Sequence, residues 1–478
     1  MDFFCVSALE ARRRSYVLLP CLGLILMLSG CAARSIPVAA PPARPLGRDV
    51  PVYQPSLTDG GVPVVPALEN PEGTISLGEA VRPALLQNPG LAAFAWEIRS
   101  REARVLQAGK PPNPAIGVFV EDLGGSRLDG EPASQSAIQP QTTIQLSQIV
   151  ELGGKRAARL QLAALNRDLA AWDYETARIN VLTDVTKAFI DVLAAQETVA
   201  LTDRTTTLVE QVQQSVGARV AAGVVSPIEE TKANIALAAV RVESDRARYV
   251  LAAARGRLAA AWGSSEARFG SAIGDLRLLP LVPSFEELKT QLAENPELAR
   301  WAVEISQRQA ALAVEQSKRV PDVSVSAGYR RFTAINTDAF LVGGSISLPI
   351  FDRNRGGIEE AHNRLAKAQE ERRAAETRVY ITLTEAYRAL SSAHAEVTAL
   401  RTALMPGAQQ TFEAISEGYR AGKFGYLDVL DAQRTLISAG GQFLRALSDY
   451  QKAGTDVERL IGAPLNKTTN IPFTNGGQ

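Results

Sequence analysis

The chain has 478 residues, of which 46% are apolar, and its 51 basic side chains are balanced by 51 acidic ones. This balance argues against a general nucleic-acid binder, which would carry a basic surplus. Aromatic residues make up 6% of the sequence, which favours long helices over a β-rich globule. With three methionines and two histidines, the chain also offers little for a soft-metal or histidine-ligated site.

The N-terminal segment is typical of an export signal that ends in a lipid-attachment site. Arginines at 12–14 precede an apolar run at 17–28, which is shorter than a membrane-spanning helix. The tetrapeptide that follows, Leu-Ser-Gly-Cys, resembles a bacterial lipobox, in which cleavage precedes the cysteine and its sulfur is acylated. We therefore expect a lipoprotein signal peptide at 1–30 and a covalent lipid on Cys31, with no other cofactor. The alternative is an ordinary signal peptide with an incidental cysteine.

The rest of the chain divides into an arm, two similar halves and a tail. Residues 31–74 carry the lipidated cysteine and are rich in proline, which predicts an extended, weakly structured arm. The two halves span 75–282 and 283–463, and a C-terminal tail covers 464–478. In each half an Asn-Pro pair opens a helix that ends at a proline. Two strand-like segments follow, and then two long helices that meet at a Gly-containing turn.

The two turns, at 221–227 and 420–426, align without gaps. The helices before them carry apolar residues in steps of three and four, which is the spacing of a coiled coil. No proline or glycine interrupts the first of these helices between 155 and 213, a run of roughly 90 Å at 1.5 Å per residue. Pro406 and Gly407 should kink or interrupt the corresponding helix of the second half.

Four segments alternate apolar residues with small or polar ones at the period of a strand. Such alternation over about ten residues is a weak signature of a membrane β-strand, although an ordinary small sheet has the same pattern. Four strands cannot close a barrel, for which about eight is the minimum, so the pattern suggests a barrel shared among subunits. Three chains would supply twelve strands. The four segments are Ile116–Glu121, Thr142–Ile149, Val323–Arg330 and Val342–Ile350.

Over about residues 75–463, this arrangement resembles the TolC-type outer-membrane factors. The resemblance implies a mainly α-helical, internally duplicated fold with a small β part. In that fold the long coiled-coil helices of three chains form an α-barrel, which continues a shared twelve-strand membrane barrel into the periplasm. Proteins of this type are channels and not enzymes, and no catalytic or nucleotide-binding motif in this sequence suggests otherwise.

Local motifs narrow the resemblance to the heavy-metal branch, the cobalt–zinc–cadmium (Czc-type) outer-membrane factors. That family works with a proton-driven inner-membrane pump of the resistance–nodulation–division class and a periplasmic adaptor. The resemblance implies a homotrimeric, lipid-anchored exit duct for divalent metal cations, placed in a Gram-negative outer membrane with a long periplasmic extension. The motifs are ELGGKR after the second strand segment, PIFDRNRG after the fourth, and SPIEETKA and GKFGYLDVLDAQR at the two turns.

The resemblance also assigns a docking role to the two turns, which would form the periplasmic tips that bind the adaptor. Glycine supplies the backbone freedom that a tight reversal needs, and proline suits the start of the returning helix. Without the resemblance, these segments are simply hairpin turns. The docking residues would be Gly223, Val224, Ser226 and Pro227 in the first half and Gly422, Lys423, Phe424 and Gly425 in the second.

Carboxylates just after the second turn are candidates for the channel entrance. Asp428 and Asp431 are three residues apart, so they lie on one helical face, and three copies would converge there. The alternative is a solvated acidic helix start, which the helix dipole favours. The resemblance adds Glu229, which matches Asp428 in position, and Tyr419 as polar groups that hold the entrance closed. At the position of Phe424, some relatives carry an arginine that links the two regions of the closed entrance. In this chain Lys423 could take over the role of that arginine.

Two other functions fit the same sequence. A multidrug or type I secretion duct would share the fold, and the substrates to which a deletion strain is sensitive would distinguish it. A non-channel periplasmic coiled-coil lipoprotein would use the four strands as an ordinary sheet, and conductance in planar bilayers would distinguish it. His362 and His394 lie far apart with no neighbouring cysteine or methionine, so we expect no metal site.

Overall fold

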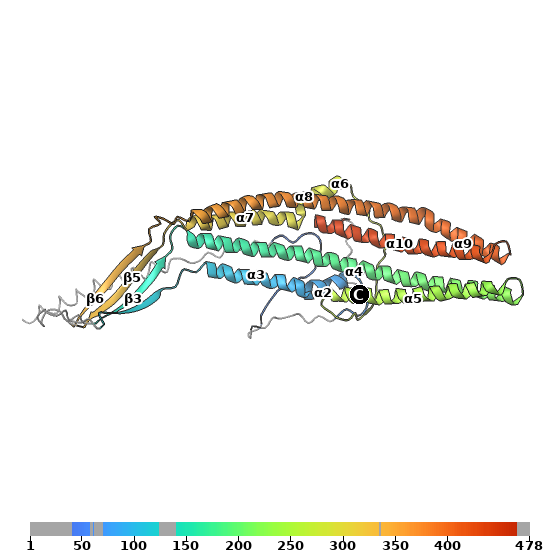
Figure 1. Cartoon of the computed structure of the whole chain (residues 1–478), viewed down its shortest axis with the longest axis horizontal. Coiled ribbons are helices and arrows are strands. Elements are labelled where there is room, and N and C mark those ends of the chain that lie inside the picture. Colours follow the sequence, from blue (N-terminus) through green and yellow to red (C-terminus); the bar gives the residue numbers. More distant parts are fainter. Residues whose placement is uncertain (1–40, 58–60, 62–69, 124–139, 334–335, 466–478) are drawn as a thin grey trace, which may run out of the picture.

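The computed structural model describes residues 41–57, 61, 70–123, 140–333 and 336–465. The molecule is an elongated, curved layer of helices with a four-stranded sheet at one end and two helical tips at the other (Figure 1). Within the described residues, no helix is long and apolar enough to cross a membrane. The predicted signal peptide, Cys31 and all but the first residues of the predicted tail lie outside the described residues.

The first half is organised around α4 (Lys155–Ala221), one uninterrupted helix of 67 residues. Two shorter helices pack along it one after the other, α3 (Pro89–Ala108) near the sheet and α5 (Pro227–Ala260) towards the tip (Figure 1). The side chain of Asn88 accepts a hydrogen bond from the amide of Leu91 at 3.0 Å and so caps the start of α3. The long and short helices predicted for this half are thereby confirmed.

The second half repeats this plan, but its long helix is interrupted. A π-helical turn, η2 (Leu400–Leu404), separates the two parts of that helix, and Pro406 lies in the first turn of the second part. Proline has no amide hydrogen and its ring clashes with the preceding turn, so a wider turn before it relieves the conflict. The interruption predicted at Pro406 is thus confirmed. The helices of this half are α7 (Pro296–Ser317), α8 (Arg355–Ala399), α9 (Met405–Arg420) and α10 (Tyr426–Ile461).

The strands form one antiparallel sheet in the order β2–β3–β5–β6. Val118 pairs with Ile144, Ile144 with Tyr329 and Tyr329 with Phe340, so these side chains share one face. That face is mostly apolar and exposed, whereas the opposite face is mostly small or polar. The strands are β2 (Ala115–Glu121), β3 (Gln141–Val150), β5 (Val323–Phe332) and β6 (Thr337–Ile346).

The last strand differs from the prediction, which placed it at Val342–Ile350. It begins at Thr337, because a short hairpin turn pairs this residue with Phe332, and it ends at Ile346, opposite the first residue of β5. Apolar residues continue the alternation beyond that point, but β5 offers them no partner. Pro349 in this stretch could not donate a ladder hydrogen bond in any case.

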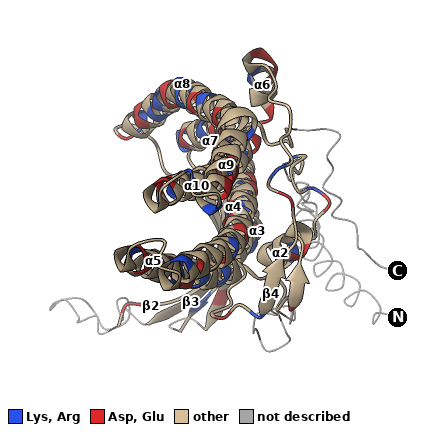
Figure 2. Ribbon diagram, turned by 90° about the vertical axis from the view of Figure 1, so that its right-hand side faces the viewer, with Lys and Arg blue, Asp and Glu red and all other residues tan. Residues whose placement is uncertain are grey.

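A small parallel sheet, which the sequence did not indicate, joins the junction between the arm and the first half to the end of the first half. It pairs β1 (Gly73–Ile75) with β4 (Phe269–Ala272). With α2 (Leu77–Gln87) and α6 (Phe285–Gln291), it lies outside the curved layer, on its convex side (Figure 2). The main core lies beneath these elements, where side chains of α4, α8 and α10 meet, among them Val185, Leu383 and Leu447.

Part of the arm is packed against the helices. The backbone amide of Arg44 donates to Glu175 at 2.9 Å, and Arg178 donates to the carbonyl of Gly47 at 3.1 Å. Arg44 itself is 7% exposed and forms an ion pair with Glu294 of the second half. This stretch of the arm therefore binds both halves of the chain.

Candidate functional site: the two helical tips

Both tips are built from the same helix-ending turn. In the first, the amide of Val224 donates to the carbonyl of Arg219 at 2.9 Å, and in the second, Lys423 donates to Gly418 at 2.7 Å. Gly223 and Gly422 have φ angles of +71° and +76°, a left-handed conformation that favours glycine. The two turns predicted from the duplicated sequence therefore have one geometry, and each requires its glycine.

The returning helices start in two different ways. In the first half the side chain of Ser226 accepts the amide of Ile228 at 3.4 Å, and Pro227 occupies the first turn. In the second half Gly425 precedes the helix, and the carboxylate of Asp428 accepts its amide at 2.8 Å. Asp428 thus caps the start of α10 and remains exposed. This is the solvated acidic helix start that the sequence offers as the alternative to an entrance residue.

The eight residues predicted to dock a partner are all exposed at this end of the molecule. Apolar side chains next to the turns are exposed with them, including Val224 at 62% and Leu427 at 64%. Asp431 is exposed as well, and within the described residues neither Asp428 nor Asp431 forms an ion pair. The tips therefore present an apolar rim next to exposed carboxylates without an ion-pair partner among the described residues.

Tyr419 and Glu229 lie in a different environment, in the seam between the two hairpins. Tyr419 is 3% exposed and packs against Tyr426, with ring centroids 6.2 Å apart. Burial raises the pKa of Tyr419 above its usual range. Burial, reinforced by Tyr419 and Glu229, raises the pKa of Tyr426 to about 12. The hydroxyl of Tyr419 and one carboxylate oxygen of Glu229 are buried without a hydrogen-bond partner among the described residues.

Arg219 is a tip residue that sequence reasoning missed. Its guanidinium donates to the backbone carbonyl of Tyr419 and lies 4.5 Å from the centroid of the Tyr419 ring. The available signal was its position in the last turn of the first long helix, where Gly418 stands in the second half. Within the described residues, Lys423 forms no ion pair and no side-chain hydrogen bond.

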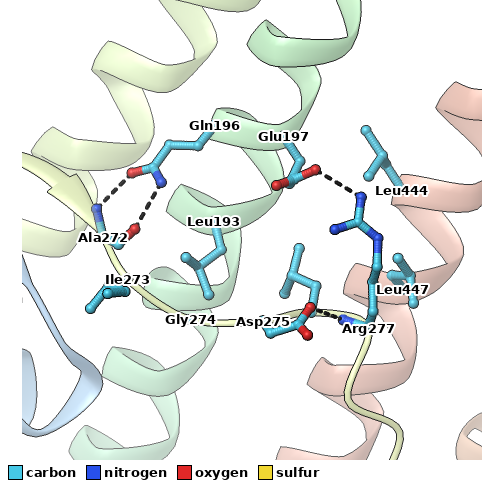
Figure 3. A pocket seen from close by; sticks show the side chains of 11 residues that line it. Leu193, Gln196, Glu197, Ala272, Ile273, Gly274, Asp275, Arg277, Leu444 and Leu447 are labelled. Atoms are coloured by element: carbon cyan, nitrogen blue, oxygen red, sulfur yellow. Dashed lines mark hydrogen bonds and ion pairs between the residues drawn. The ribbon is translucent and has the colours of Figure 1, made fainter.

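A cavity of about 320 Å³ lies away from the tips, between α4, α10 and the segment after β4 (Figure 3). The side chain of Gln196 accepts a hydrogen bond from the amide of Ala272 at 2.7 Å and donates one to its carbonyl at 2.9 Å. Arg277 donates to Glu197 at 3.1 Å. These polar groups satisfy one another and fasten the connector to the helix. The described residues include no group of three or more histidine, cysteine or acidic side chains that could hold a metal ion.

The architecture and the tips together define an elongated class of protein, built from two repeated sets of long helices with a four-stranded sheet at one end. The family model described as "Outer membrane efflux protein" matches residues 80–264 and 288–463, one range within each half of the chain. The chain belongs to this family of efflux channels, so it is not an enzyme and its location is the outer membrane.

Individual relatives agree with this assignment. The chain is 36% identical over 423 residues to the cobalt-zinc-cadmium resistance protein CzcC of Cupriavidus metallidurans, covering 87% of this chain and 98% of that protein. It is 28% identical to the nickel-cobalt-cadmium resistance protein NccC of Alcaligenes xylosoxydans xylosoxydans, over 62% of this chain and 67% of that protein.

Solved structures show the same fold. The channel CusC superposes with a TM-score of 0.68 at 17% identity, covering 87% of this chain and 99% of that one. A membrane protein from Pseudomonas aeruginosa superposes with a TM-score of 0.68 at 20% identity, covering 83% of this chain and 99% of that one. The TolC-like, mainly helical and internally duplicated fold class is thereby confirmed.

Proposed function

We propose that this protein is the exit duct of a tripartite efflux system and that it exports divalent heavy-metal cations. The observation that carries the proposal is the similarity to CzcC over nearly the whole of that protein. Two further relatives are named for nickel, cobalt or cadmium resistance. The partners are a periplasmic adaptor, which binds the tips, and a proton-driven inner-membrane pump of the resistance–nodulation–division class.

The duct is a homotrimer in this proposal, and two features of the single chain support it. Within the described residues, β2 and β6 each have one edge without a partner strand, which a neighbouring copy would supply. On α5, exposed apolar side chains recur every seven residues, the spacing of a coiled-coil seam. The residues of this stripe are Ile228, Ile235, Val242 and Tyr249, which are 57%, 65%, 65% and 78% exposed.

The strands and the lipid hold the duct in the membrane. The exposed apolar face of the sheet suits contact with lipid, and the small or polar face suits a water-filled lumen, so that three chains make a twelve-strand barrel. Cys31 carries a covalent lipid that anchors the arm. Palmitate should label the parent protein but not the Cys31→Ser variant, and equal labelling would contradict the anchor.

Metal selection lies mainly in the pump, because this chain brings no metal-ligand cluster of its own within its described part. Growth of a deletion strain over graded zinc, cobalt, cadmium, nickel and copper, with dyes and detergents in parallel, tests the substrate class. Hypersensitivity restricted to divalent metals, and reversed by the intact gene, is expected. Sensitivity to organic compounds alone would leave the channel in place and contradict metal export.

A further inference from the structure

We propose that Arg330 neutralises Glu121 inside the outer end of the duct, so that the last part of the barrel does not hold back the exported cation. This inference rests on the proposed three-chain barrel and on its cationic cargo. Both residues lie at the end of the sheet that points away from the helices, close to the ends of β2 and β5 (Figure 1). In a duct whose helices extend into the periplasm, that end faces the outside.

The strand register places both side chains on the face that would line the lumen. Arg330 pairs with Thr143 of β3, and Glu121 pairs with Gln141, which lies two residues before Thr143 on the same strand. Paired residues, and residues two apart on one strand, share a face of the sheet. These four side chains therefore lie opposite the exposed apolar face that carries Ile144.

Three strands hold the guanidinium of Arg330 in place. It donates to the hydroxyl of Thr143 at 2.8 Å and to the side-chain oxygen of Gln141 at 3.5 Å, and it forms an ion pair with Glu121 at 2.9 Å. The side chain of Arg330 is 27% exposed, whereas that of Glu121 is 50% exposed. The positive group is thus fixed against the wall, and the carboxylate is the more open of the two to ions in the lumen.

Charge is scarce on this face of the sheet. Among the residues of the four described strands, Glu121 and Arg330 are the only charged ones that the register places on it. One more carboxylate, that of Asp122, lies just beyond β2 and accepts a hydrogen bond from Gln141 at 2.9 Å.

Arg330 therefore balances a negative end of the lumen. Without it, Glu121 and Asp122 would give each chain two carboxylates at this end and no described cation on the same face. Three chains would gather these charges around one opening. Converging negative charge raises the local concentration of cations, which would retain the cargo where it has to leave.

The neighbouring residue provides a matched control. Arg331 lies on the opposite, apolar face of β5 and forms an ion pair with Asp338 of β6 at 3.0 Å. It carries the same charge as Arg330 and lies at nearly the same distance from the end of the strand. In the proposed barrel it would face the lipid headgroups instead of the lumen.

The test compares reversal potentials of purified, full-length trimers in planar bilayers, with dilute salt on the side of the sheet. Charges act over about 10 Å at 0.1 M salt, so a dilute outer solution makes this end the most sensitive to a change of charge. We expect Arg330→Gln to raise the ratio of cation to anion permeability several-fold and Glu121→Gln to lower it. The double variant and the control Arg331→Gln should both resemble the parent.

The direction of the shifts decides the outcome. The inference is overturned if Arg330→Gln and Glu121→Gln shift the ratio in the same direction or not at all, or if Arg331→Gln shifts it as far as Arg330→Gln does. If Arg330→Gln forms no trimers, Glu121→Gln decides by itself, because it keeps the arginine and its bonds to β3. A parent trimer that carries no current would overturn the proposed duct as well, whereas unshifted variants of a conducting parent would overturn this inference alone.

Discussion

Gly153 and Gly154, between β3 and α4, show how backbone conformation and neighbouring atoms can restrict a position to glycine. Both have left-handed backbones, with φ angles of +68° and +73°. A Cβ at 153 would lie 2.6 Å from the Cβ of Val320, whereas nothing lies within 4 Å of one at 154. Both glycines therefore serve the bend between strand and helix, and only the first also serves close packing.

Alanine substitutions should separate these two effects. Gly154→Ala should lower the free energy of unfolding by about 1 kcal/mol, because of the left-handed backbone alone. Gly153→Ala should lower it further, since the segment around Val320 would have to move as well. Thermal unfolding of both purified variants measures the order, and equal losses would show that the contact with Val320 is not restrictive.

Glu458 gives the protein a pH dependence remote from the tips. Burial raises the pKa of this carboxyl to about 7, and the amide of Leu465, which donates to it at 2.9 Å, offsets only part of that effect. The folded protein therefore keeps the proton to a higher pH than the unfolded chain, whose pKa is near the ordinary 4.5. Stability contributed by this site is present at low pH and is lost as the pH rises towards 7 and above.

Glu458→Gln removes this titration while leaving an oxygen that can accept the amide of Leu465. We expect the variant to unfold at a higher temperature than the parent at pH 8 and to approach the parent at pH 5. Unfolding temperatures at the two pH values provide the measurement. A difference that does not change with pH would mean that the carboxyl is not protonated in the folded protein.

The tip residues mark the limit of prediction at this scale. The glycines at 223 and 422 were predictable because a tight turn demands them wherever it occurs. Arg219 was not, because its place at the tip depends on a contact with Tyr419, some 200 residues away in the sequence. Glu229 and Tyr419 were expected at the entrance, but no sequence pattern indicated that Tyr419 and one carboxylate oxygen of Glu229 would be buried in the seam between the hairpins.

At the scale of elements, α10 contains two adjacent glycines with different surroundings. A Cβ at Gly440 would approach side-chain carbons of Leu201 on α4 at 3.1 and 3.3 Å, whereas a Cβ at Gly441 would meet nothing within 4 Å. Glycine inside a helix is destabilising by about 1 kcal/mol relative to alanine. Only Gly440 thus has a packing reason to be glycine.

Gly441→Ala should therefore raise the unfolding temperature of the protein, and Gly440→Ala should raise it less or lower it. Gly256 on α5 serves as the matched control, because a Cβ there also meets nothing within 4 Å, and Gly256→Ala should behave like Gly441→Ala. Thermal unfolding followed by circular dichroism compares the three variants. A larger gain at 440 than at 441 would contradict the helix packing described here.

Element boundaries followed the sequence wherever a local signal existed. Asn-Pro pairs and Ser caps set the starts of five helices, and Pro406 set the interruption of the second long helix. The end of β6 was predicted wrongly, because alternation continues past Ile346 and only the register with β5 ends the strand. The parallel pairing of β1 with β4 is a contact between distant short segments, which carry no periodic signal.

At the scale of the whole molecule, the duplication accounts for the arrangement of the parts. Two long helices, each accompanied by two shorter ones, place the sheet at one end and both tips at the other (Figure 1). The sequence repeat predicted this arrangement, because equivalent segments fold alike. A single chain does not show contacts between copies. The proposed trimer is therefore supported by the strand edges that lack a partner among the described residues and by the stripe on α5.

The assembled duct should prefer cations at its entrance. Three copies would gather the exposed carboxylates of Asp428 and Asp431, and converging negative charge attracts cations. The double variant Asp428→Asn with Asp431→Asn keeps an acceptor for the helix cap and should reduce cation selectivity. Reversal potentials in a salt gradient measure this effect, with Glu243→Gln on the exposed surface of α5 as the control. Unchanged potentials would exclude both aspartates from the constriction.

The most direct test of the account is single-channel recording of the purified, full-length protein in planar lipid bilayers. The account predicts discrete current steps of uniform size, carried by trimers. Intact trimers that insert but carry no current under any voltage would contradict it, and would favour a structural periplasmic lipoprotein over an efflux duct.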